Sequence, residues 1–316
     1  MKILLAPMEG VINHYMRRTL TSVGGYDGCV TEFVRITDQC LPDRVFKRLS
    51  PELEQQGKTP NGVPVVVQLL GGDPEAMALN AQRVASLGAP AIDINFGCPS
   101  RFVNRKMGGS VLLREPERVH AIVAAVRKAV NKTIPVTAKM RLGYEDDALA
   151  LDNALAIEAA GAAALTVHAR TRLEGYTPPA RWEALAPLRQ ALGIPLIANG
   201  DIHSLEDYYR CVQASGCVDV MLGRGAIADP SLANQIKQSA DGQSIEAMSW
   251  FEITRLILST CEQMEQDYLK KHVLMRIKQW LGMLRRQHPS GQATFDRVRR
   301  MKDLDEVKAI LLQARS

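Results

Sequence analysis

The cysteine best placed to do chemistry in this sequence is Cys98, within the segment Asn95-Phe96-Gly97-Cys98-Pro99. Gly97 and Pro99 predict a turn, and a long basic loop containing Gly108-Gly109 follows. An ordinary thiol has a pKa of about 8.5, so it is protonated at neutral pH and can donate a proton as a general acid. With a base nearby it can instead be a nucleophile, or it can be an inert buried cysteine. Cys98 is therefore a candidate catalytic acid, with two alternatives open.

A second segment, Gly223-Arg224-Gly225-Ala226-Ile227-Ala228, has the form G-x-G-x-x-A. In a dinucleotide-binding fold this motif follows the first strand, and an acidic residue lies about 20 residues further on. Here it follows a late apolar run, Val218–Leu222. We favour a phosphate site completed by Asn199-Gly200-Asp201, because backbone N–H groups at a helix start bind anions. This implies one phosphate on the bound molecule, as in FMN.

Short apolar runs alternate with longer amphipathic stretches over the first 240 residues. The predicted strands are Ile3–Ala6, Cys29–Glu32, Val65–Leu70, Ala91–Asn95, Ile134–Met140, Ala163–His168, Leu196–Asn199 and Val218–Leu222. Helices are predicted between several of them, for example over 74–87, 116–130, 149–160 and 205–214. Alternating βα units predict a parallel sheet, and eight units fit a (β/α)₈ TIM barrel. A doubly wound open sheet is the alternative, but it has fewer strands and a fingerprint near its first turn.

Polar residues recur at the predicted C-terminal ends of these strands, where barrel enzymes hold their ligands. They include Glu9, Glu32, Gln68, Asn95, Lys139, Arg141, His168, Arg170, Asn199, Asp201 and Arg224. Any one of them can be an ordinary strand-end group or a helix N-cap. Together they predict a ligand site at one end of the barrel.

The strand pattern stops after a polar patch at Ser239–Gln243. Four helices are predicted over 250–268, 271–287, 293–301 and 304–314, because apolar residues recur there at three- and four-residue spacing. A turn is predicted at His288–Gly291. We therefore expect a catalytic barrel at residues 1–240 and a small all-helical domain at residues 241–316.

The excess positive charge lies in this helical region. From Trp250 onward, thirteen Lys and Arg residues face eight Asp and Glu residues, which accounts for the whole net charge of +5. A basic region on a neutral body suits a polyanionic partner such as nucleic acid. An ordinary solvated helix face is the alternative.

Composition excludes several other classes of protein. No apolar run approaches the roughly 18 residues that a membrane helix needs, and the N-terminal apolar stretch is too short for a signal peptide. The six cysteines form no Cys-x-x-Cys pair, and no His/Cys cluster has zinc spacing. We expect a cytoplasmic protein with no metal site and no membrane partner.

Six segments, taken together and in order, resemble the tRNA-dihydrouridine synthase family. They are Ala6-Pro7-Met8-Glu9-Gly10, the Cys98 segment, Ala138-Lys139-Met140-Arg141-Leu142-Gly143-Tyr144, Val167-His168-Ala169-Arg170-Thr171-Arg172, Ala198-Asn199-Gly200-Asp201-Ile202 and Met221-Leu222-Gly223-Arg224-Gly225-Ala226. The resemblance spans residue 1 to about residue 239, and the whole chain is most similar to the bacterial C-type branch of the family.

The resemblance implies FMN bound over the strand ends of a barrel that is followed by a helical tRNA-binding domain. Pro7 and Met8, with Glu9 beside them, would line the isoalloxazine ring. Gln68 and Lys139 would bind its pyrimidine edge, and His168 would lie close by. The phosphate would be held by Asn199, Gly200, Asp201, Gly223 and Arg224.

The implied reaction is reduction of a uridine in tRNA to 5,6-dihydrouridine, with NADPH as the reductant. Hydride passes from flavin N5 to uridine C6, and Cys98 protonates C5. The C-type branch implies uridine 16 in the D loop, which must be flipped out of its stack.

The resemblance also implies substrate contacts. Asn95 would meet the Watson–Crick edge of the uridine, and Arg141 and Tyr176 would line the entrance. The tRNA body would be bound by Arg35, Arg276, Lys278, Arg299 and Arg300. A monomer suits one tRNA per chain.

Two competing interpretations remain. The first is an FMN barrel oxidoreductase that acts on a free pyrimidine, which leaves the basic helical extension unexplained. The second is a non-enzymatic RNA-binding protein on a barrel that has lost its activity.

Overall fold

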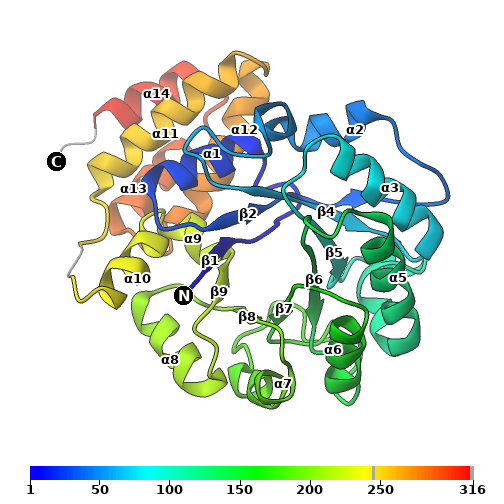
Figure 1. Cartoon of the computed structure of the whole chain (residues 1–316). Helices are drawn as coiled ribbons and strands as arrows, with labels where there is room; N and C mark the ends of the chain where they lie inside the picture. Colours follow the sequence, from blue (N-terminus) through cyan, green and yellow to red (C-terminus); the bar gives the residue numbers. More distant parts are fainter. Residues whose placement is uncertain (244–245, 314–316) are drawn as a thin grey trace.

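The computed structural model describes residues 1–243 and 246–313. Its centre is a closed barrel of parallel strands, drawn near the middle of Figure 1. The strands are β1 (Ile3–Leu5), β2 (Gly28–Val30), β3 (Val34–Arg35), β4 (Val65–Leu70), β5 (Ile92–Phe96), β6 (Val136–Arg141), β7 (Ala164–His168), β8 (Leu196–Asn199) and β9 (Val220–Leu222). The barrel closes because β1 pairs with both β2 and β9, and β2 pairs with β4.

The prediction of eight barrel strands is confirmed, with strand ends within two residues of those expected. The second strand is interrupted, because β2 stops at Val30 and its direction resumes in β3, which pairs only with β4. Thr31, Glu32 and Phe33 occupy the interruption, and Glu32 and Phe33 line the cavity described below.

Helices surround the barrel on its outer face. They are α1 (His14–Val23), α2 (Asp43–Leu49), α3 (Pro74–Ser86), α4 (Arg101–Asn104), α5 (Pro116–Ala129), α6 (Ala150–Ala159), α7 (Ala186–Ala191), α8 (Leu205–Ser215), α9 (Arg224–Ala228) and α10 (Leu232–Ala240). Several begin at side-chain caps, such as Asn13 for α1 and Asp73 for α3, whose oxygens accept backbone N–H bonds. The four helices predicted in this part are all present.

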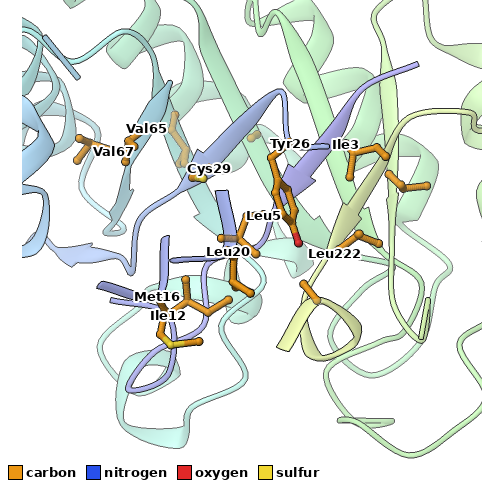
Figure 2. Close-up of a cluster of buried hydrophobic side chains, with 14 of the residues drawn as sticks. Ile3, Leu5, Ile12, Met16, Leu20, Tyr26, Cys29, Val65, Val67 and Leu222 are labelled. Atoms are coloured by element: carbon orange, nitrogen blue, oxygen red, sulfur yellow. The ribbon is translucent and has the colours of Figure 1, made fainter. Parts of the chain in front are cut away.

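Two apolar layers follow from the alternation of side chains along each strand. Ile3 and Leu5 belong to the main apolar core, and Figure 2 shows them in one cluster with Leu20 of α1 and Leu222 of β9. Ala6 belongs to a separate small cluster with Val30, Ile197 and Met221. The barrel is therefore a packed core, and the cavity described below lies beyond the strand ends.

Four helices follow the barrel: α11 (Trp250–Glu265), α12 (Lys270–Leu284), α13 (Pro289–Val298) and α14 (Leu304–Leu312). They lie beside α1 and α9 at one side of the barrel (Figure 1). Buried polar contacts fix this arrangement: Thr19 and Thr260 share a hydrogen bond of 2.8 Å, and Trp280 Nε1 donates to the Ile227 carbonyl at 3.1 Å. The fold class, a TIM barrel with C-terminal helices, is confirmed, while the division at residue 240 stays a prediction.

The turn predicted at His288–Gly291 was wrong, because Pro289, Ser290 and Gly291 form the first turn of α13. Proline suits this position, since the first helical N–H has no partner within the helix. The helix consequently begins four residues earlier than predicted. The helix predicted over 304–314 is present as α14, and Ala314 lies outside the described residues.

No helix in the described part of the chain is long and apolar enough to cross a membrane.

Candidate active site

A cavity of about 460 Å³ lies at the C-terminal ends of the strands. Every residue predicted to bind cofactor lines it: Pro7, Met8, Glu9, Gln68, Lys139, His168, Asn199, Gly200, Asp201, Gly223 and Arg224. So do Cys98, Asn95, Arg141 and Tyr176. Arg35, Arg276, Lys278, Arg299 and Arg300 do not line it. Residues from all parts of the barrel meet here because the C-terminal ends of parallel strands share one rim.

The loop after β5 holds Cys98 by its backbone. Asn95 Oδ1 accepts the Cys98 N–H at 2.9 Å. The Cys98 carbonyl accepts from Ser110 Oγ at 2.9 Å and from Asn104 Nδ2 at 3.0 Å. The half-buried thiol faces the cavity, and burial raises its pKa. The thiol is therefore neutral at neutral pH and has a proton to give.

A chain of buried polar side chains supports this loop from within the barrel. Thr137 Oγ1 and Gln68 Nε2 donate to the two carboxylate oxygens of Asp93, at 2.6 and 2.7 Å. Gln68 Oε1 in turn accepts from Asn95 Nδ2 at 2.8 Å. The carboxamide oxygen of Asn95 is committed to the loop N–H groups of Gly97 and Cys98. One amide hydrogen of Asn95 is left for a pyrimidine, so its first task in this structure is to shape the Cys98 loop.

Lys139 brings a buried ammonium group to the cavity. Its Nζ donates to Asn199 Oδ1 at 3.0 Å, and Asn199 is fixed by donating to the Met221 carbonyl at 2.8 Å. Burial, followed by the charge of Arg141, lowers the Lys139 pKa from 10.5 to about 8. No carboxylate of the described residues forms an ion pair with this ammonium. A ligand with acceptor atoms or negative charge would offset the cost of burying this ammonium group.

The loops after β7, β8 and β9 form a second cationic region around Asp201. Its carboxylate accepts from Arg170, from the Ala180 N–H and from Arg224 Nη2 at 2.9 Å. Burial opposes ionisation, but hydrogen bonds from His203 and Arg170 hold the Asp201 pKa well below its usual range. Asp201 is thus an anion that anchors two arginines. Arg224 keeps the rest of its guanidinium for a ligand in the cavity.

His168 lies between these two regions as a neutral imidazole. Burial, together with the charges of Arg141 and Lys139, lowers its pKa well below 6.5. Its ring packs against the backbone at Gly200, where φ is +122° and an added Cβ would lie 2.9 Å from His168 Cδ2. Glycine adopts this positive φ without strain and has no Cβ to collide with the imidazole, so it suits this position best. The β8 loop can therefore approach the imidazole closely.

Arg141 and Tyr176 both line the cavity. The Arg141 guanidinium is buried and donates to the carbonyls of Gly97, Thr171 and Gly175 at 2.8–3.0 Å. The Tyr176 ring is 57% exposed, with the guanidinium carbons of Arg141 and Arg224 at 5.1 and 5.4 Å from its centre. Arg141 thus joins the Cys98 loop to the loop that carries Tyr176.

The opposite side of the cavity is acidic and touches the C-terminal helices. Glu32 accepts the Gly10 N–H, and burial raises the pKa of both Glu32 and Glu9. The Gly10 carbonyl accepts from Arg276 Nη1 of α12 at 2.5 Å. Arg276 therefore reaches the loop beside the cavity.

The other basic residues predicted to bind tRNA lie outside the cavity. Lys278 donates to the carbonyls of Arg299 and Met301, so it fixes the end of α13. Arg299 is exposed and pairs loosely with Asp296 at 3.7 Å, and Arg300 is exposed. Arg35, on β3, stacks on Phe102. The structure thus brings together the residues expected at the cofactor and the uridine, and leaves those expected at the tRNA body outside the cavity.

Sequence reasoning missed the residues that support the site from behind. Asn104 and Asp93 are the chief examples, and each is buried with its polar atoms satisfied. The only signal for Asp93 was a carboxylate inside an apolar strand, which must find donors when buried. Among the described residues, no group of three His, Cys, Asp or Glu side chains could hold a metal ion.

Comparison with known proteins is consistent with this geometry. Residues 4–315 match the family model described as Dihydrouridine synthase (Dus). A tRNA-dihydrouridine(16) synthase of Aquipseudomonas alcaligenes is 47% identical over 311 residues, which cover 98% of this chain and 99% of that protein. One from Shewanella oneidensis is 48% identical over 314 residues, covering 99% and 98%.

A solved structure of 2-naphthoyl-CoA reductase aligns with a TM-score of 0.56 at 14% identity, covering 77% of this chain and 50% of that one. At this identity the likeness supports the barrel fold alone. Family membership rests instead on a match that runs through nearly the whole chain, barrel and C-terminal helices together. The chain therefore belongs to the dihydrouridine synthase family.

Proposed function

We propose that this chain reduces uridine 16 in the D loop of tRNA to 5,6-dihydrouridine, with bound FMN as cofactor and NADPH as reductant. The observation that carries the proposal is that tRNA-dihydrouridine(16) synthases match the chain over nearly its whole length. The strand-end cavity, which sets a neutral thiol among buried cations, supports it. We also propose that the enzyme acts in the cytoplasm as a monomer on one tRNA.

The residues present fit an FMN. Lys139, Gln68 and Asn199 place a buried cation and amide groups on one side of the cavity, which suits the acceptor atoms of a flavin pyrimidine ring. Arg224, with Gly200 and Gly223 leaving the backbone open beside it, suits the phosphate. Asp201 would act through Arg224 by orienting its guanidinium, since a carboxylate repels a phosphate.

When bound and reduced by NADPH, the flavin would supply the hydride that uridine C6 accepts. The chain supplies the proton: the Cys98 thiol gives it to C5, so that two hydrogens add across the C5–C6 double bond. The backbone bonds to Asn95, Asn104 and Ser110 keep this thiol directed into the cavity. Arg141 and Tyr176 would guide the flipped base past the rim, and the basic C-terminal helices would hold the tRNA backbone.

Mapping of dihydrouridine tests the whole proposal. The gene is expressed in a bacterial strain that lacks all of its own dihydrouridine synthases, and tRNA positions are compared with and without it. We expect dihydrouridine at position 16 alone. If tRNA stays unmodified while purified flavin-loaded protein reduces free uracil or orotate with NADPH, the free-pyrimidine oxidoreductase is the correct function.

Arg224→Ala is expected to weaken FMN binding about 10- to 100-fold while leaving riboflavin binding unchanged. A charge-assisted hydrogen bond to phosphate contributes about 1.5–3 kcal/mol, and riboflavin has no phosphate to lose it. Quenching of flavin fluorescence on titration measures both affinities. Arg210→Ala, which removes an exposed arginine outside the cavity, is the matched control. Equal loss of FMN and riboflavin affinity would instead indicate that Arg224 shapes the cavity.

Reversing two charges on the C-terminal helices, Arg299→Glu with Arg300→Glu, is expected to weaken tRNA binding and flatten its salt dependence. Each lost phosphate contact reduces the slope of log K against log [salt] by about 1. The control is Lys128→Glu with Lys132→Glu, two exposed lysines near the start of β6, at the opposite end of the barrel from the cavity. An unaltered slope in the first double variant would place the tRNA on another face.

A further inference from the structure

A short basic loop beside the cavity mouth carries an exposed aromatic ring. Phe102 lies in α4, four residues after Cys98, and its side chain is 62% exposed. Its neighbours Arg101, Arg105 and Lys106 are also exposed, and within the described residues none of the three forms an ion pair. A single exposed ring is common on protein surfaces and carries no argument by itself. Two features distinguish this ring: its contact with an arginine and its position beside the cavity.

That arginine is Arg35, whose guanidinium carbon lies 4.4 Å from the centre of the Phe102 ring. Arg35 ends β3, two residues beyond Phe33, which lines the cavity, whereas Phe102 follows β5. The stack therefore bridges two loops that both begin at the cavity wall. The guanidinium orients the ring and adds positive charge beside it, while much of the ring stays open to solvent.

The loop that presents the ring is firmly held. Asn104 is buried and donates to the carbonyls of Cys98 and Ser100 at 3.0 and 2.7 Å. Met107 lies so close to the β4–α3 turn that a Cβ at Gly72 would be 1.7 Å from its carbonyl oxygen. A surface fixed in this way loses little conformational freedom when a partner binds. The ring is thus a preformed face next to the mouth of the cavity.

We propose that Phe102, backed by Arg35, is a stacking platform for an unpaired nucleobase that neighbours the uridine in the cavity. The proposal rests on the proposed function, and it adds a recognition element for single-stranded RNA. A base drawn out of its stack leaves its neighbours without a stacking partner. An open aromatic face accepts any base, and the surrounding arginines and lysine meet the phosphates on either side.

Two variants of Phe102 and one remote control variant separate stacking from packing. Phe102→Leu keeps an apolar side chain but removes the aromatic face, Phe102→Tyr keeps the face, and Leu79→Ala removes an exposed apolar side chain from α3 as a remote control. We expect Phe102→Leu to raise the KM for tRNA about 10-fold. Its kcat at saturating tRNA, its flavin content and its Tm should match the wild type, and Phe102→Tyr should restore the KM.

A fluorescent base gives a direct readout. tRNA with 2-aminopurine next to position 16 is titrated with each protein, because stacking on an aromatic ring quenches this base. We expect quenching with the wild type and Phe102→Tyr, and at least a twofold smaller change with Phe102→Leu. Equal quenching and equal KM in Phe102→Leu overturn the platform, as does a parallel loss of Tm and flavin, which would make the ring a packing element. A wild-type protein that forms no dihydrouridine in tRNA would overturn the proposed function instead.

Discussion

Replacing Cys98 with alanine should leave flavin binding intact and lower the rate of dihydrouridine formation about 10²- to 10⁴-fold, the usual contribution of a general acid. The thiol is the proton donor in the proposed reaction, and burial keeps it protonated by raising its pKa. The loop is held through the Cys98 backbone, which alanine retains. Dihydrouridine formed at saturating tRNA and NADPH measures the rate, and the flavin absorbance of the purified variant measures cofactor retention.

Cys40→Ala is the matched control, since Cys40 is an exposed thiol outside the cavity. The direction of the pKa shift adds a second test. A group whose pKa is raised keeps its proton to higher pH, so the wild-type rate should hold through neutral pH and fall only as the thiol ionises in the alkaline range. A Cys98→Ala variant with near-normal yield would assign the proton to another donor.

The barrel could be predicted because its pattern is local. Each predicted strand is an apolar run of four to seven residues, and the predicted helices show apolar residues at three- and four-residue spacing. The site followed from topology, since parallel strands in a barrel bring their C-terminal ends to one rim. That is why residues as distant in sequence as Met8 and Arg224 could be expected in one cavity, and the structure places them there.

Other features depend on contacts that no local pattern contains. Asn104 looks like any loop residue in sequence, yet its amide spans the Cys98 carbonyl and the Ser110 hydroxyl once the loop has folded. The resemblance assigns Asn95 to the substrate, whereas in the structure its side chain is largely engaged with Gln68 of β4 and the backbone of the Cys98 loop. At Pro289 the local signal is ambiguous, because proline both breaks helices and begins them.

Replacing Lys139 with methionine should change stability and cofactor binding in opposite directions. Without flavin, the variant should be more stable than the wild type at pH 7 by about 1–3 kcal/mol, because an ammonium whose pKa is lowered by burial disfavours the folded state. Flavin affinity should fall about 100-fold, because a charged donor to the ring is lost. Thermal unfolding with and without FMN measures both effects, and Lys132→Met, at an exposed lysine, is the control.

The direction of the Lys139 pKa shift determines how the stability difference between wild type and Lys139→Met changes with pH. The Lys139 pKa is about 8 in the folded protein against about 10.5 for a free lysine, so the unfolded chain binds more protons between these values. Wild-type stability therefore rises relative to Lys139→Met across this window, and the advantage of the variant is full below pH 8 and gone above about 10.5. Saturating FMN should stabilise the wild type by about 2.7 kcal/mol more than the variant at pH 7, because the wild type binds FMN about 100-fold more tightly, and should thereby offset or reverse the variant's advantage. If the variant is less stable than the wild type without flavin, the Lys139 ammonium stabilises the folded protein. If it is more stable there and less stable with FMN, the buried charge is kept in place for the ligand.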